Sequence, residues 1–561
     1  MGPVPHADPR ALPVRLRRPS GRRGDGRARK AGGRRDAARG GSCVVRDSYD
    51  ICAVGGGPDA LVAAACLADA GHSVLVVGER GRPGGVAANV QIAPGFQFPV
   101  FPETLPSLDP AVALDLDLGR HGLELVVSDP VLTAVGPDGA AFTLPRDLER
   151  ARLAIAGLSA RDAARFPEFV AELGAFGGFL RRLLDQPPLQ LDAGLPDAIP
   201  AAFAALGLGA KRVNALLRAL PMPLTDYLND WFESDSLKAA LAGSALTGTR
   251  LGHRAPGTAG LFLHFHAFGR PEPLAWIRPA RGGSSSVGRA LREAAHAAGA
   301  HLESESGGVR RIAAGRSGVT GVELRDGRTI ACDMVVSDAA PGTTLLGWTG
   351  AGTLSPDFVH EVENIRYRGT AARVGLALSA LPRIGGGPED DPRLGGVVQV
   401  GARMDDLERA SDAWKYGRIA LEPLVFAALP SVHDRELATP GGAVLAATVQ
   451  SVPEGADEGA VLEATLGSLE RAFPGIRDLV TASRVLTPRT LERGFGLIEG
   501  SFHQGEPTMD QFYSLRPVPG FARHRTPVAG LYLAGPGTYP YGGLHGVSGR
   551  NAARAAQEDL A

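Results

Sequence analysis

The sequence predicts an α/β fold built around a parallel sheet, and three observations lead to this prediction. The apolar run at residues 51–54 breaks on three consecutive glycines and opens directly into a segment rich in Ala, Val and Leu at residues 61–70. Gly71 ends that segment, and residues 74–77 form a second apolar run with the β-branched composition of a buried parallel strand. Near the other end of the chain, residues 530–535 repeat the order of strand and glycine before a helical segment.

The first glycine turn has the spacing of a dinucleotide-binding loop. Gly55 permits the sharp turn out of the strand, and Gly57 has no side chain to keep a phosphate away from the backbone. Ala60 stands at the third glycine position, where a small residue lets helix and strand pack closely. Because a helix N-terminus attracts anions, we expect this turn to bind a dinucleotide pyrophosphate. The alternative is a glycine-rich turn of another α/β fold.

The second strand ends without the carboxylate that usually meets the nucleotide ribose. The usual position falls on Gly78, and Glu79 comes one residue later. Either a bulge lets Glu79 reach the ribose, which we favour because no other acid lies nearby, or this contact is missing. Gly84 and Gly85 follow, and we count them with the cofactor-binding residues.

The middle of the chain predicts a mixture of helices and strands. Residues 146–241 have apolar side chains at helical spacing, with Ser159 and Asp162 as the capping box of one helix. Asp326 and Gly327 form a hairpin turn between short strands. The other expected elements are strands at residues 261–268, 332–337, 367–385 and 443–453, and helices at residues 287–300, 357–364, 405–411 and 459–472.

The C-terminal strand, glycine and helix favour FAD over NAD. Residues 530–535 lead through Gly546 and Val547 into a helix at residues 550–560. An NAD enzyme does not need this second copy, whereas in many flavoproteins the C-terminal strand completes the sheet and the next helix points its N-terminus at the flavin. The pair of glycine turns therefore predicts FAD as the cofactor.

Length and composition indicate a globular protein of two domains or one elaborate domain. The chain has 561 residues, 44% of them hydrophobic, and a net charge of −1. It has no apolar run of roughly 18 residues, which argues against a membrane-spanning helix. Its four cysteines form no C-x-x-C pair, which indicates a reducing, cytoplasmic location, and contact with a membrane surface is left open. We expect Cys52 and Cys66 to be small core residues.

The first 46 residues belong to another compositional class. They carry twelve Arg and one Lys against three Asp, with many Gly and Pro and no apolar periodicity, so we expect a disordered basic extension. One interpretation is an Arg-rich targeting peptide, or an arm that binds nucleic acid or anionic lipid. We favour the other interpretation, that this segment lies upstream of the true start and has no role, and we expect no nucleic acid partner.

Four separate segments of the chain resemble the phytoene desaturase-related FAD flavoproteins. The most similar branch is that of the pyridine nucleotide-disulfide oxidoreductase domain-containing protein 2 and the desaturase-type β-carotene ketolases. The resemblance covers residues 48–561. The segments that carry it are Thr225-Asp226-Tyr227-Leu228-Asn229-Asp230-Trp231-Phe232-Glu233-Ser234, Ile277-Arg278-Pro279 with Gly282-Gly283, Met509-Asp510-Gln511-Phe512 with Arg516-Pro517, and Gly537-Thr538-Tyr539-Pro540 with Gly549-Arg550-Asn551-Ala552-Ala553.

This resemblance implies a p-hydroxybenzoate hydroxylase-like fold. A Rossmann-like FAD-binding domain would be built from residues 47–135, 275–345 and 495–561. An inserted α+β substrate domain would comprise residues 136–274 and 346–494.

The resemblance also assigns cofactor contacts to the glycine turns and strand ends. In order from the pyrophosphate through the adenosine to the flavin ring, these contacts are Gly55, Gly57 and Ala60, then Glu79, Arg80 and Val309, then Gly535, Gly546 and Val547.

Oxidation of a C–C or C–N bond also needs a proton acceptor, unless the substrate cation is stabilised. The candidates are Tyr539, Tyr541 and His545 in the loop beside the flavin, and His503, Glu506 and Asp510 before it. We favour His545, and the alternative is a histidine that points from a turn into solvent. Asp510 and Arg516 are equally well explained as a structural ion pair.

His264 and His266 would lie on one face of the expected strand at residues 261–268. A metal site would need a third ligand, and none is evident, so we expect no metal.

The leading hypothesis is an FAD-dependent oxidoreductase of dehydrogenase or desaturase type. The sequence leaves its electron acceptor and oligomeric state open. Its substrate would be a small apolar molecule, with isoprenoid or carotenoid-like compounds among the candidates. One alternative is an amine-oxidase-type flavoenzyme, with Tyr539 and Tyr541 as the aromatic pair that faces the flavin. Another is a flavin-binding scaffold or regulator with little turnover.

Overall fold

A computed structural model describes residues 45–78, 84–188, 206–269 and 273–561, and residues 45–561 form one compact unit. The predicted basic extension falls, up to residue 44, outside the described residues, as do Glu79 and Arg80.

Five parallel strands form the sheet that carries the first glycine turn. Their order across the sheet is β17, β11, β1, β2 and β7, and every neighbouring pair is parallel. The strands are β1 Ile51–Gly55, β2 Val74–Gly78, β7 His301–Glu303, β11 Met334–Ser337 and β17 Leu531–Leu533. Strands from both ends of the chain meet in this sheet, which confirms the predicted Rossmann-like α/β fold.

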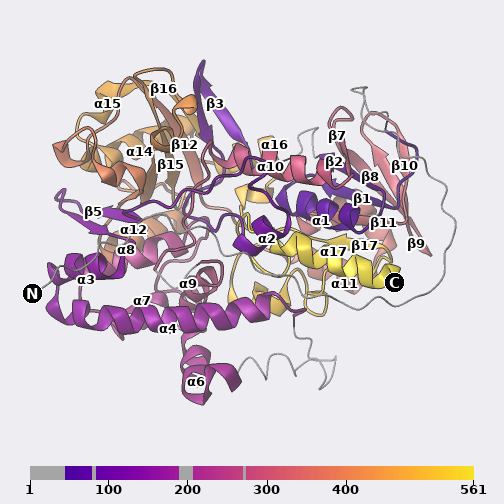
Figure 1. The fold of residues 1–561 in the computed structure, drawn as a ribbon, viewed down its shortest axis with the longest axis horizontal. Coiled ribbons are helices and arrows are strands. Elements are labelled where there is room, and N and C mark those ends of the chain that lie inside the picture. Colours follow the sequence, from indigo (N-terminus) through magenta and orange to yellow (C-terminus); the bar gives the residue numbers. More distant parts are fainter. Residues whose placement is uncertain (1–44, 79–83, 189–205, 270–272) are drawn as a thin grey trace, which may run out of the picture. The chain divides into compact units, whose positions relative to one another are not determined.

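Alternate side chains of β1 supply two different cores. Ile51 and Ala53 pack in the core that holds Leu61 of α1, whereas Cys52 and Val54 pack on the opposite face. On that opposite face lies an antiparallel sheet of β8 Val309–Gly315, β9 Gly318–Leu324 and β10 Thr329–Ala331. On the first face, α1 Pro58–Asp69 lies between α10 Ser284–Ala297 and α17 Val547–Leu560 (Figure 1).

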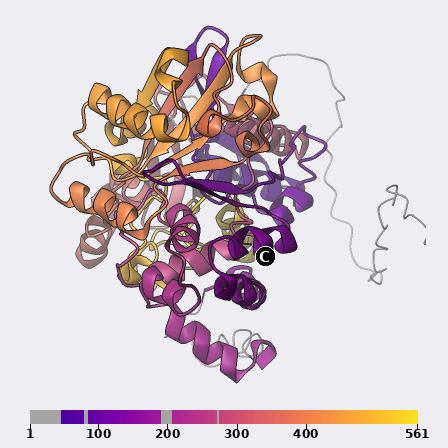
Figure 2. The ribbon, with the colours of Figure 1, turned by 90° about the vertical axis from the view of Figure 1, so that its left-hand side faces the viewer.

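A second, seven-stranded sheet has the order β16, β12, β15, β14, β13, β5 and β6. Its strands are β5 Leu132–Val135, β6 Ala141–Leu144, β12 Ala372–Leu378, β13 Val397–Val400, β14 Val425–Ala428, β15 Ala443–Val449 and β16 Val480–Leu486. One face packs against α14 Glu458–Ala472, and Figure 2 shows most of the sheet in orange. The first predicted FAD-binding segment, residues 47–135, ends in β5, and β5 pairs with β13 in this second sheet. The predicted division into domains stays a prediction.

Helices fill most of the region between residues 146 and 266, as the apolar spacing predicts. They are α3 Leu148–Ala156, α4 Ala160–Leu184, α6 Ala210–Ala219, α7 Leu224–Asn229, α8 Asp235–Ala245 and α9 Thr258–His266. The Ser159 hydroxyl accepts a hydrogen bond from the Asp162 N–H and caps α4. The strand expected at residues 261–268 is wrong, because this segment belongs to α9. All nine residues of α9 are buried, so it has no polar face to reveal a helical period.

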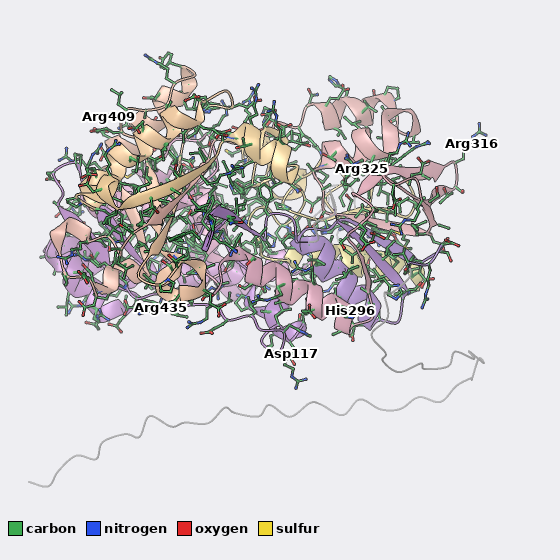
Figure 3. The ribbon with its side chains drawn as sticks, turned by 90° about the horizontal axis from the view of Figure 1, so that it is seen from above. Asp117, His296, Arg316, Arg325, Arg409 and Arg435 are labelled. Atoms are coloured by element: carbon green, nitrogen blue, oxygen red, sulfur yellow. The ribbon has the colours of Figure 1, made fainter. Side chains whose placement is uncertain are left out.

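Shorter elements complete the described chain. They are the hairpin β3 Asn89–Ala93 and β4 Phe96–Pro99, and the helices α2 Pro110–Asp115, α11 Pro356–Glu363, α12 Met404–Lys415, α13 Pro430–His433, α15 Ile476–Leu479 and α16 Pro488–Phe495. The expected helices near residues 357–364, 405–411 and 459–472 are confirmed as α11, α12 and α14. Charged side chains such as Arg316, Arg409 and Arg435 lie on the outside (Figure 3).

Candidate active site

The first glycine turn already binds an anion supplied by the chain. Gly57 is the N-cap of α1, and Pro58 at the first helical position has no N–H to offer. The Gly57 N–H donates to Oδ1 of Asp338 at 3.2 Å, and the Ala60 N–H donates to Oδ2 at 3.0 Å. A Cβ on Gly57 would lie 2.4 Å from Oδ2, so any larger residue would push the Asp338 carboxylate away from the turn. The turn can therefore bind an anionic group through its backbone N–H groups, and its residues fit a pyrophosphate.

The second glycine pair lies directly on this turn. The Gly84 N–H donates to the Gly56 carbonyl at 2.6 Å. A Cβ on Gly85 would stand 3.2 Å from the Cα of Gly57. Gly78, at the position of the missing ribose acid, faces Gly56. A Cβ on Gly56 would lie 2.5 Å from the Gly78 Cα. The structure thus brings together the glycines that the sequence predicted here.

The C-terminal glycine turn reaches the same residue, Asp338. A Cβ on Gly535 would lie 2.8 Å from the Asp338 carbonyl oxygen. Gln504 links the two segments, because its Nε2 donates to that carbonyl at 2.8 Å and its Oε1 accepts from the Gly537 N–H at 3.2 Å. Asp338 therefore contacts one turn through its carboxylate and the other through its backbone.

The start of α17 also packs on the start of α1. Gly546 is the N-cap of α17, with φ at 73°. A Cβ at this position would come within 3.0 Å of the Val62 side chain, so glycine leaves room for Val62. The Gly549 N–H donates to Oδ1 of Asp59 at 2.8 Å. Val309 lies elsewhere, at the start of β8, where its carbonyl accepts from Nε of Arg325 at 3.3 Å. The predicted contacts of these residues with FAD stay predictions.

His545 has no ring nitrogen free to accept a proton in this structure. Its ring is fully buried and stacks flat on Phe268, with the ring centroids 4.5 Å apart. Nδ1 accepts a hydrogen bond from the Val547 N–H at 3.1 Å, so its lone pair is in use. Burial lowers the pKa of His545 to about 3.

Two other buried histidines keep a lone pair open. His264 and His503 each point Nε2 at a carbonyl, that of Tyr541 at 2.8 Å and that of Thr247 at 2.9 Å. A carbonyl only accepts, so in both rings Nε2 carries the proton and Nδ1 the lone pair. Neither Nδ1 has a hydrogen-bond partner in the described part of the chain. Burial lowers the pKa of each histidine to about 4, which keeps both neutral.

Tyr541 lies at the centre of this group of side chains. Its ring centroid is 4.8 Å from that of His503 and 5.7 Å from that of His264, and its hydroxyl has no partner among the described residues. The Arg516 guanidinium lies 4.6 Å from the ring centroid and donates to the carbonyls of Gln511 and Pro536. His503 and Tyr541 were both among the predicted proton-acceptor candidates. Their contact with each other, and with His264 and Arg516, was not predicted, because it depends on how separate segments fold together.

The expected pair of Asp510 and Arg516 is wrong. Asp510 is largely exposed, and its carboxylate pairs with Arg366 at 2.6 Å. Arg516 is buried and bonds to backbone carbonyls, where burial lowers its pKa to about 10. Tyr539 is also anchored, because its hydroxyl donates to the Leu183 carbonyl at the end of α4 at 2.8 Å.

His264 and His266 do not share a strand face, because they lie two residues apart on the helix α9. His266 donates from Nδ1 to the Phe262 carbonyl at 2.8 Å. Within the described ranges, no group of three His, Cys, Asp or Glu side chains is placed to hold a metal ion. Nor does that part of the chain contain a helix of the length and apolarity needed to cross a membrane.

The N-terminus of α1 binds an anion, and glycine turns from both ends of the chain approach it. These features define the class of this protein, which is an FAD-dependent oxidoreductase. Comparison with known families gives the particular group. Residues 61–379 match the model of the flavin containing amine oxidoreductases, and the chain belongs to that family. The predicted cofactor, FAD, is thereby confirmed.

Relatives extend along most of the chain. It is 31% identical to pyridine nucleotide-disulfide oxidoreductase domain-containing protein 2 of Rattus norvegicus, over 92% of this chain and 94% of the rat protein. It is 24% identical to a phytoene desaturase (neurosporene-forming) of Cereibacter sphaeroides, over 90% and 93%. These matches confirm the resemblance stated from the sequence. An oxidoreductase from Methanosarcina mazei shares the fold, with a TM-score of 0.57 at 18% identity, over 91% of this chain and 99% of that one.

Proposed function

We propose that this protein is a dehydrogenase of the desaturase type that acts on an apolar substrate, with an isoprenoid hydrocarbon as the first to test. FAD supplies the two-electron acceptor when it is bound. The observation that carries the proposal is the open lone pair on Nδ1 of His503, buried beside Tyr541. Similarity to a phytoene desaturase along most of the chain supports the substrate class.

In a desaturation the substrate loses a hydride and a proton, and a C=C bond forms between the two carbons. His503 Nδ1 is placed to take the proton, since Nε2 of the same ring is held by the Thr247 carbonyl. The side chains around Tyr541 are mainly aromatic, among them Phe265 and Phe512, which suits an apolar substrate and excludes water.

The same geometry disfavours amine oxidation, the alternative drawn from the sequence. A substrate amine is cationic at neutral pH, and the Arg516 guanidinium already lies over the Tyr541 ring. Two like charges in a buried site repel strongly. Tyr539, the other member of the expected aromatic pair, is held by the Leu183 carbonyl.

The test is anaerobic reduction of the FAD-loaded protein, followed by flavin absorbance. An isoprenoid hydrocarbon should bleach the flavin and yield a product with two hydrogens fewer, whereas primary amines should not. Bleaching by amines alone would support the amine oxidase instead, and protein that takes up no flavin would exclude both.

His503→Leu tests the proton acceptor. We expect turnover to fall by about 10²–10⁴-fold with unchanged flavin absorbance, as for loss of a general base. His266→Leu is the matched control, because His266 is equally buried but packs between Phe262 and Trp276. Equal losses in both variants would contradict the role given to His503.

A further inference from the structure

A cavity of about 290 Å³ lies on the side of α17 away from α1. Gly549 packs against Asp59 of α1, whereas Asn551, Arg554 and Glu558 line the cavity at the spacing of one helix face. The opposite wall is formed by residues 185–188, after α4, and by residues 523–525, before β17. This volume is just below the roughly 300–1,000 Å³ of ligand pockets, so the cavity suits a small ligand.

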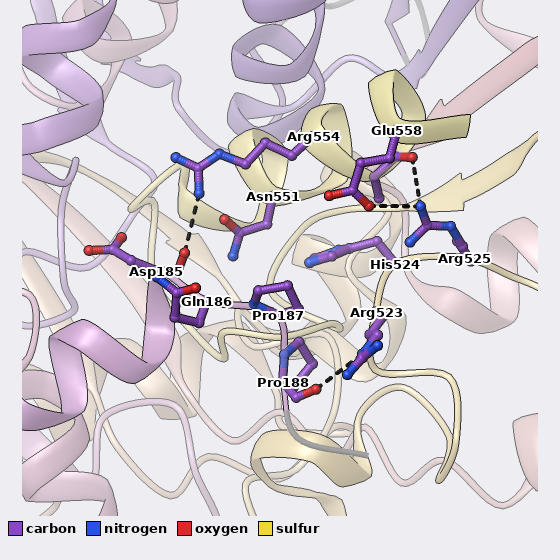
Figure 4. Close-up of a pocket in the computed structure, with 11 residues that line it drawn as sticks. Asp185, Gln186, Pro187, Pro188, Arg523, His524, Arg525, Asn551, Arg554 and Glu558 are labelled. Carbon is purple, nitrogen blue, oxygen red and sulfur yellow. Dashed lines mark hydrogen bonds and ion pairs between the residues drawn. The ribbon is translucent and has the colours of Figure 1, made fainter. Parts of the chain in front are cut away.

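Two residues that line this cavity, His524 and Asn551, each carry a buried acceptor atom with no hydrogen-bond partner in the described chain. His524 is 3% exposed, and its Nδ1 faces the Leu533 carbonyl at 2.9 Å, so Nδ1 carries the proton and Nε2 the lone pair. Nε2 has no hydrogen-bond partner among the described residues, and neither has Oδ1 of Asn551, whose Nδ2 donates to the Leu184 carbonyl. Figure 4 shows both side chains turned toward the space between α17 and Pro187. Buried acceptors of this kind call for a hydroxyl or amine donor.

One arginine of the cavity wall, Arg554, has no carboxylate beside it in the described chain. Arg525 is neutralised by Glu558 at 3.0 Å and Asp559 at 2.9 Å. The Asp185 carboxylate is engaged by Arg550 at 2.6 Å and by Arg181 at 3.0 Å. Arg554 donates only to the backbone carbonyl of Asp185, at 3.2 Å, so its charge meets no carboxylate in the described chain.

We propose that this cavity binds a small hydroxylated anion, such as a phosphorylated or carboxylated sugar. The Arg554 guanidinium binds the anionic group, and His524 Nε2 and Asn551 Oδ1 accept hydrogen bonds from its hydroxyls. The site is distinct from the residues assigned to FAD and to catalysis, although it shares the helix α17 with them.

Calorimetric titration of the FAD-loaded full chain tests this site, with four probes. Ribose 5-phosphate and gluconate should bind with one saturable site, and whichever binds more tightly identifies the anionic group. Ribose and inorganic phosphate should each bind at least about tenfold more weakly, because each lacks one half of the contacts. No saturable heat from any probe would overturn the proposal and leave only ordered water in the cavity.

Variants locate the binding. Arg554→Gln should weaken it about tenfold, the worth of a charge-assisted hydrogen bond, and Arg554 is exposed, so the variant should fold. Asn551→Leu should weaken ribose 5-phosphate but not inorganic phosphate. Arg316→Gln, at the exposed turn between β8 and β9, is the control and should change nothing (Figure 3). Equal binding by all four proteins would overturn the proposal, whatever the outcome of the desaturase tests.

Discussion

Asp59 is the residue at which burial and charge conflict most directly. It is 2% exposed, in the first turn of α1, and accepts a hydrogen bond from the Gly549 N–H. Burial raises its pKa to about 7, the hydrogen bond to Gly549 opposes the shift, and the nearby Asp338 adds to it. Below pH 7 the folded protein therefore favours the protonated form of Asp59, next to the turn that is predicted to bind the pyrophosphate.

The raised pKa of Asp59 predicts how stability depends on pH. Since the folded-state value of about 7 exceeds the ordinary 3.8, this contribution is complete below pH 3.8 and is lost as the pH rises through 7. The free energy of unfolding should fall by up to about 4 kcal/mol over that range. Asp59→Asn keeps the acceptor for Gly549 and removes the titration. Urea unfolding of both proteins at several pH values checks this, and parallel curves would contradict it.

At the level of elements, the contact of α1 with α17 depends on a glycine. A Cβ on Gly549 would stand 2.1 Å from the Asp59 carbonyl oxygen, which is backbone and cannot turn aside. Gly549→Ala should therefore lower the free energy of unfolding by about 1–3 kcal/mol, the cost of overpacking, and weaken FAD binding. The measurements are urea unfolding and flavin titration.

A second helical glycine provides the control for Gly549. Gly467 lies inside α14, and a Cβ there would meet nothing within 4 Å. Gly467→Ala should raise stability by about 0.5–1 kcal/mol, because alanine favours the helix. If both substitutions had the same sign, the close approach of α1 and α17 would not be the cause.

The elements differ in how far the sequence predicts them. The strands and helices around the glycine turns are local features with clear boundaries, and they are confirmed in order. Residues 261–268 are expected as a strand, but most of them belong to α9, which is buried on all sides. An apolar run without a polar face fits either structure. Tertiary packing decides such a segment, and packing is not visible in a single stretch of sequence.

Across the whole molecule, some residues of the candidate site could be predicted from the sequence and others could not. The glycines at 55, 57, 84, 85 and 535 were predicted, because close backbone approach leaves no alternative residue. Asp338 and Gln504 were not, because each depends on segments far apart in the chain. His503 was among the candidate proton acceptors, but its place beside Tyr541 depends on the fold and was not predicted. For Asp338 one signal existed: it follows β11 at the carboxyl edge of the parallel sheet, where ligand-binding residues gather.

The last prediction concerns the chain before the compact unit. Residues 1–44 carry eleven Arg and one Lys against three Asp. In the described chain, contacts with the fold begin right after them: Val45 packs against the core that holds Val54, and the Asp47 carbonyl accepts a hydrogen bond from the Ala331 N–H at 2.9 Å. A protein that begins at Val45 should therefore bind FAD and unfold at the same temperature as the full chain.

The protein that begins at Val45 should bind less to anionic lipid vesicles, since each basic residue near such a surface contributes about 1 kcal/mol to binding. Vesicle sedimentation at low salt measures this difference, and neutral vesicles are the control. Equal binding of both proteins to anionic vesicles would place any membrane contact in the folded unit, and loss of FAD binding would show that the basic segment supports the fold.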